Sequence, residues 1–136
     1  MVFPAQGLAL MLSFLWVALG GAIGSVLRLG VNMSAPHLLG NNFPWATLTV
    51  NVVGSFLMGL LSAILAEKFS GQLDLRLFIT TGVLGGFTTF SAFSLDVFGL
   101  MQRGENSMAL VYSLASVGLS ILAVFGGFMV SRVLNT

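Results

Sequence analysis

The sequence predicts an all-α membrane protein with four transmembrane helices, the third of which is broken near its middle. Of the 136 residues, 57% are hydrophobic and only 7% are charged, and the mean hydropathy of +1.03 is far above that of soluble domains of this size. A membrane-spanning helix takes about 20 apolar residues. The chain therefore supplies four spans and short loops, which form one domain over residues 1–136.

The first two spans are predicted from two apolar runs. The first span covers about residues 8–31; its run is too long for a signal peptide, and no basic residue precedes Arg28. The second covers about residues 46–65 and follows Pro44 and Trp45, because proline suits a helix start and tryptophan suits the level of the lipid headgroups. Residues 32–45 between them are expected to form a loop.

The third and fourth spans are predicted at about residues 75–100 and 108–134, joined by a turn at 102–106. Gly82, Gly85 and Gly86 precede Thr88 and Thr89, a composition that lowers the preference for helix and lets threonine hydroxyls compete for backbone partners. We therefore expect a break from Gly85 to Thr89. Close helix packing is the alternative explanation for the glycines, but it does not account for the two threonines.

Polar residues form a row along one face of the second span and another along the fourth. A serine or threonine in a span usually bonds to nearby backbone, but two rows suggest a shared polar track, and an asparagine amide needs a partner outside its own helix. The rows recur at every fourth residue: Thr47, Asn51 and Ser55 on the second span, and Tyr112, Ser116 and Ser120 on the fourth.

The basic residues divide almost evenly between the two membrane faces. Lys68, Arg76 and Arg132 lie on the face with both termini, and Arg103 lies on the other face, together with Arg28 if its head reaches the surface. A count of three against two does not hold one orientation. Arg28 and Asp96 are expected near the same face, where we predict that they pair or jointly shape a vestibule.

Composition excludes several classes of function. The formal net charge is only +1, so we expect no nucleic-acid partner. With no cysteine and one histidine, the chain lacks the usual zinc and haem ligand sets. No buried nucleophile, general base and orienting group can be assembled from these residues, so we predict that the chain is not an enzyme.

Three segments closely resemble the Fluc family of fluoride channels, also called CrcB. They are residues 20–24 with Arg28, residues 47–56, and residues 85–94, which read Gly-Gly-Phe-Thr-Thr-Phe-Ser-Ala-Phe-Ser. The resemblance covers nearly the whole chain. It implies a passive, fluoride-selective channel that exports fluoride from the cytoplasm and confers fluoride resistance. It also implies a multi-pass protein of the bacterial cytoplasmic membrane that forms an antiparallel, dual-topology homodimer with a sodium ion at its centre.

The same resemblance implies roles for single residues. Arg28 and Asp96 would shape a vestibule, and the backbone carbonyls of Gly85 and Thr88 would hold the sodium ion. This chain has Ser91-Ala92 where the family usually has Ser-Thr, which puts a pore role for that threonine hydroxyl in doubt. The fluoride pore would be lined by Thr47, Asn51, Phe90, Ser91, Phe93, Tyr112, Ser116 and Ser120.

Pore chemistry can be argued from the residue types themselves. Fluoride is small and strongly hydrated, so a pore must replace its water with N–H and O–H donors. The edges of phenylalanine rings carry the positive part of the ring quadrupole and can favour an anion.

Two other functions stay open. A small dual-topology multidrug transporter also has four spans but needs a membrane-buried carboxylate, and the first span contains no acidic residue. A non-conducting membrane assembly subunit would explain the glycines but not Asn51 beside two polar rows.

Overall fold

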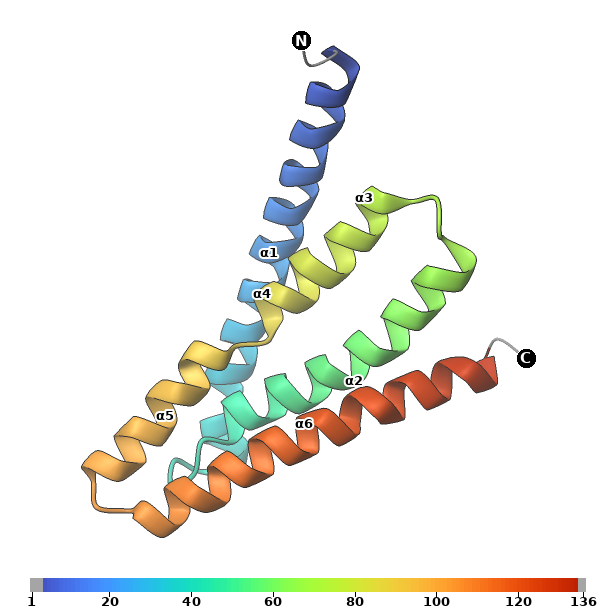
Figure 1. Cartoon of the computed structure of the whole chain (residues 1–136). Coiled ribbons are helices and arrows are strands. Elements are labelled where there is room, and N and C mark those ends of the chain that lie inside the picture. The colour runs from blue at the N-terminus through green and yellow to red at the C-terminus, as the bar shows by residue number, and fades with distance from the viewer. Residues whose placement is uncertain (1–3, 135–136) are drawn as a thin grey trace.

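The computed structural model describes residues 4–134 as an all-helical chain (Figure 1). Four helical segments are long and apolar enough to cross a membrane: Gly7–Leu39, Trp45–Lys68, Leu73–Gln102 and Asn106–Leu134. This confirms the prediction of four helices that are long and apolar enough to span a membrane. The elements in chain order are α1 (Pro4–Leu39), α2 (Trp45–Lys68), α3 (Leu73–Arg76), the π-helix η1 (Leu77–Leu84), α4 (Gly85–Phe87), α5 (Phe90–Gln102) and α6 (Asn106–Leu134).

The first helix is longer than expected. The predicted loop over residues 32–45 is wrong in its first half, because α1 continues through Pro36 to Leu39. Gly40 ends the helix. Its φ of +82° lies in the left-handed region, which glycine adopts without strain, and its N–H donates to the Pro36 carbonyl at 3.0 Å. With 36 residues, α1 is about 54 Å long. It exceeds the thickness of a bilayer core, and its N-terminal part projects beyond the other helices (Figure 1).

Glycines set the distance between α1 and the third span. A Cβ atom on Gly20 would lie 2.5 Å from the Phe78 carbonyl oxygen, and one on Gly86 would lie 2.5 Å from the Gly21 carbonyl oxygen. Larger residues here would push the helices apart, as at other small-residue interfaces in membranes. For Gly86, and for Gly82 opposite Gly20, close packing is therefore the correct explanation.

Helices α2 and α6 lie side by side over most of their length (Figure 1). Glycines again allow the contact, since a Cβ on Gly59 would collide with the Val124 carbonyl and one on Gly127 with the Phe56 carbonyl. The two polar rows stand on these helices. The packing of α2 against α6 therefore decides which polar residues of the two rows lie next to each other.

The third span is broken, as the sequence predicts, but the break is shorter than Gly85 to Thr89. Gly85 is helical, with φ −65° and ψ −36°. Only Thr88 (φ −77°, ψ 158°) and Thr89 (φ −156°, ψ 117°) are extended. The Thr89 hydroxyl accepts a 3.1 Å bond from the Ala92 N–H and so caps the start of α5. Threonine chemistry thus makes the break, and Figure 1 shows the chain changing direction there.

Candidate functional site

A cavity of about 220 Å³ opens at the break in the third span. Three parts of the chain build it: α2, the segment from the break into α5, and α6. It brings together five of the predicted pore residues. The lining residues are Asn51, Ser55, Thr88, Thr89, Phe90, Phe93, Ser116, Val117 and Ser120.

Two serine hydroxyls of α6 are buried at this cavity. Ser116 is only 4% exposed, and within residues 4–134 neither its Oγ nor that of Ser120 makes a hydrogen bond of good geometry, although Ser116 interacts with the Tyr112 hydroxyl one turn earlier. Ser113 on the same helix behaves differently, because its Oγ donates to the Ala109 carbonyl at 2.7 Å. Buried hydroxyl groups are nearly always satisfied. Ser116 and Ser120 are therefore the groups best suited to donate to a bound species.

Asn51 contacts the break itself. Its Oδ1 accepts the Thr89 N–H at 2.8 Å, and its Nδ2 donates to the Thr89 carbonyl at 3.0 Å. The expected partner outside its own helix is thus the backbone of the third span. An amide nitrogen carries two hydrogens, and Thr89 uses one of them.

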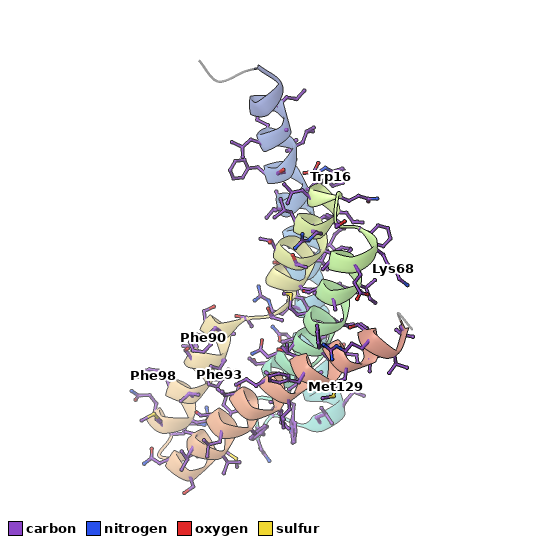
Figure 2. All side chains as sticks on the ribbon, turned by 45° about the vertical axis from the view of Figure 1, so that its right-hand side comes forward. Trp16, Lys68, Phe90, Phe93, Phe98 and Met129 are labelled. Carbon is purple, nitrogen blue, oxygen red and sulfur yellow. The ribbon has the colours of Figure 1, made fainter. Side chains whose placement is uncertain are left out.

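Phe90 and Phe93 stand at the start of α5, next to the break (Figure 2). Their ring centroids are 5.3 Å apart with an interplanar angle of 51°. Phe93 is 9% exposed and also packs on the Tyr112 ring, with centroids 5.4 Å apart, whereas Phe90 is 75% exposed. One ring of the pair is therefore fixed in the core of the chain, and the other projects from it.

Three predicted pore residues lie outside this cavity. The Tyr112 hydroxyl donates to Asp96 Oδ2 at 3.1 Å, and its side chain is fully buried. Thr47 lines a neighbouring cavity of about 270 Å³ together with Asp96. Ser91 is exposed, and its Oγ lies 3.2 Å from the Thr89 Oγ1. The row on α6 is therefore divided between Tyr112 and the two serines.

The two predicted vestibule residues do not pair with each other. Nη1 of Arg28 lies 3.5 Å from the Thr88 carbonyl oxygen, while Asp96 accepts from Tyr112. The expected pairing is wrong because each residue has another partner: Arg28 reaches the break between η1–α4 and α5, and Asp96 bonds to Tyr112 on α6. The alternative, that the two residues jointly shape a vestibule, stays a prediction. At 3.5 Å the Arg28 contact is mainly the attraction between a cation and a carbonyl dipole.

Two residues that shape the site, Thr89 and Gly54, were given no site role from the sequence, although Thr89 was placed in the predicted break. Thr89 supplies both backbone groups that Asn51 binds. Gly54 lets α2 approach the break, because a Cβ there would collide with Cγ2 of Thr88. Gly54 lies one turn after Asn51 and between the polar positions of α2. This position in the polar row was the feature of the sequence from which a role for Gly54 at the site could have been predicted.

The break and its cavity lie within the region that matches a known family. The model of the family described as CrcB-like protein, Camphor Resistance (CrcB), matches residues 15–128. The chain belongs to the CrcB family.

Relatives of this CrcB protein cover nearly its whole length. A protein of Rhizobium etli is 53% identical over 124 residues, which are 91% of this chain and 99% of the relative. One from Agrobacterium fabrum is 52% identical over 122 residues, 90% of this chain and 98% of the relative. One from Chelativorans sp. is 57% identical over 116 residues, 85% of this chain and 93% of the relative. All three are named fluoride-specific ion channel FluC.

Proposed function

We propose that this CrcB protein is a passive, fluoride-selective channel of the cytoplasmic membrane that exports fluoride and confers fluoride resistance. The observation that carries the proposal is the cavity at the break, where two buried serine hydroxyls make no hydrogen bond of good geometry within residues 4–134 and lie beside a pair of phenylalanine rings. The names of the relatives support it.

The chemistry of the cavity suits a small, strongly hydrated anion. Its lining side chains are uncharged and include the amide of Asn51 and the hydroxyls of Ser55, Ser116 and Ser120. Such donors replace water around an anion without holding it as tightly as a buried ammonium group would. The edges of Phe90 and Phe93 add a weakly positive surface. Among residues 4–134, those that line the cavity include no carboxylate that could couple transport to protons, so the lining gives no support to the multidrug-transporter alternative.

A second copy of the chain is the proposed cover of the cavity. The cavity is open on one side, and Phe90 projects beside it with 75% of its surface exposed. A polar cavity inside a bilayer must be closed by protein or filled by water. An antiparallel, dual-topology homodimer would close it and would carry two equivalent pores.

The orientation of the two copies can be measured directly. Because Arg28 contacts the break, the charge count becomes Lys68, Arg76 and Arg132 against Arg103, which by itself favours one orientation. The chain has no cysteine, so Ser70→Cys and Asn41→Cys each introduce a single label site at opposite ends of the spans. In dual topology, an impermeant maleimide labels about half of each variant in intact cells. Labelling of only one variant would reject dual topology.

The proposed sodium ion needs oxygen ligands. The Thr89 N–H, which would bond to Gly85 in an unbroken helix, donates to Asn51 instead, so the break releases the Gly85 carbonyl from this donor. Residues 4–134 contain no cluster of three or more His, Asp or Glu side chains, so the ligands would be neutral backbone oxygens. Gly85 is exposed on the third span, and Thr88, whose carbonyl oxygen also faces Nη1 of Arg28 at 3.5 Å, is half-buried beside it. One chain would supply these two carbonyls and a second copy the other two.

The test is fluoride efflux from liposomes that contain the purified protein, measured with a fluoride electrode. Chloride-loaded liposomes are the matched control. Rapid loss of fluoride with chloride retained is the expected result. Absence of fluoride efflux from correctly folded protein would reject the channel function. It would favour the alternative function, a non-conducting membrane assembly subunit.

A further inference from the structure

One side chain binds both polar groups of a single residue at the break. Asn51 accepts the Thr89 N–H at 2.8 Å and donates to the Thr89 carbonyl at 3.0 Å. Thr89 is only 8% exposed, so water does not compete freely for these groups. In the interior of a membrane protein, an unsatisfied backbone group costs several kcal/mol. Asn51 thus replaces the helical partner that the extended backbone gives up.

Two further contacts hold the same point from outside the third span. Nη1 of Arg28 on α1 faces the Thr88 carbonyl at 3.5 Å. Gly54 on α2 leaves room for the Thr88 side chain. The break is therefore fixed by α1 and α2, whereas α5, which follows it, packs mainly on α6.

We propose that Asn51 is a positioning residue, which holds the Thr88–Thr89 break in its extended form and thereby sets the position of Phe90 and Phe93 at the cavity. Phe90 follows Thr89 directly and Phe93 is the first buried residue of α5. A shift of the Thr89 peptide is transmitted to both rings, because α5 begins at Phe90. The effect on ion selectivity rests on the proposed fluoride channel, but the effect on the backbone does not.

Hydrogen–deuterium exchange tests the backbone effect without any ion flux. Asn51→Leu keeps a similar side-chain volume and removes both bonds. We expect amides in peptides covering residues 88–95 to exchange about tenfold faster than in the wild type. Of the two lost bonds only the one from the Thr89 N–H protects an amide, and the loss of one hydrogen bond accounts for a factor of about ten. Ser120→Ala is the matched control: it lines the same cavity but bonds nothing in residues 4–134, and its exchange should equal that of the wild type. Unchanged exchange in Asn51→Leu, or an equal increase in Ser120→Ala, would overturn the proposal.

Asn51→Asp supplies a second test that does not depend on Asn51→Leu folding. A protonated carboxyl group has the same donor and acceptor pair as the amide, whereas a carboxylate cannot donate to the Thr89 carbonyl. Exchange at residues 88–95 should therefore match the wild type at about pH 3, below the ordinary pKa of aspartic acid, and exceed it at about pH 9, well above it. The wild type at both pH values corrects for intrinsic exchange rates and for the charged and titratable groups nearest the break, which are Arg28 on α1, Asp96 on α5 and Tyr112 on α6. The same ratio to the wild type at both pH values would reject the positioning role.

Ion flux then separates positioning from anion contact. In liposomes, Asn51→Leu should pass chloride, which the wild type retains, and should pass less fluoride than the wild type. The reason is that the ring pair moves. Ser120→Ala should only slow fluoride. If the wild type carries no fluoride, the proposed function fails while the exchange result still decides the role of Asn51.

Discussion

The Tyr112 hydroxyl donates a 3.1 Å hydrogen bond to Asp96 Oδ2 and so joins α6 to α5 three residues after Phe93. The Tyr112 ring is fully buried, with its centroid 5.4 Å from those of both Phe43 and Phe93. In residues 4–134, Tyr112 therefore anchors α5 to the core rather than lining the cavity with Ser116.

This bond predicts unequal effects of two nearly isosteric changes. Tyr112→Phe leaves Asp96 without its donor and should destabilise the fold by about 1–2 kcal/mol, whereas Asp96→Asn keeps an acceptor and should cost less. Thermal unfolding in detergent compares the two, and the double variant should be no less stable than Tyr112→Phe alone. Additive losses would show that the residues act independently.

Phe90 and Phe93 differ in exposure, so substituting them should have different effects on stability. Phe93→Ile should lower both fluoride efflux and thermal stability, because the ring is 9% exposed and packs on Tyr112. Phe90→Ile should lower efflux with little change in stability of the monomer, because this ring is 75% exposed. Phe98→Ile, also on α5 and exposed (Figure 2), is the control. Normal efflux in both test variants would show that the rings only pack.

Removal of the Ser116 and Ser120 hydroxyls should impair function without harming the fold. Ser120→Ala deletes a buried donor that bonds no group in residues 4–134, and Ser116→Ala deletes one whose only interaction there is a weak one with the Tyr112 hydroxyl, so stability should change by no more than about 1 kcal/mol in either variant. Fluoride efflux should fall. Ser113→Ala removes a satisfied hydroxyl of the same helix and should leave efflux unchanged. Equal efflux in all three variants would argue against an anion path along α6.

Gly54 tests the approach of α2 to the break. Gly54→Ala places a methyl group against Cγ2 of Thr88 and within 3.2 Å of the Phe87 ring, so we expect a loss of about 1–3 kcal/mol in stability and reduced efflux. Gly118→Ala on α6 meets nothing within 4 Å and is the control. Adding Thr88→Ser removes the obstructing methyl and should restore part of the loss. Full stability of Gly54→Ala would mean that the break can shift at little cost.

The break shows how far local sequence reasoning reaches. Two adjacent threonines after a glycine-rich run predict an interruption, and the interruption is present at Thr88–Thr89. Its length was wrong because glycines are ambiguous: Gly86 serves helix packing against Gly21, and only the structure shows that neighbour. The loop predicted from residue 32 was also wrong in its first half. Helix α1 continues to Leu39 and contains Pro36 in its last turn.

The sequence by itself determined the four spans and the helical faces that carry polar residues, because hydropathy and a spacing of four are local properties of the chain. Only the tertiary structure decided which of these residues meet. The rotation and separation of the helices follow from glycine contacts between segments far apart in the chain, such as Gly20 with Gly82 and Gly59 with Val124. Those contacts place Asn51 on Thr89, Tyr112 on Asp96 and Arg28 on Thr88, and they leave Ser116 and Ser120 facing the cavity.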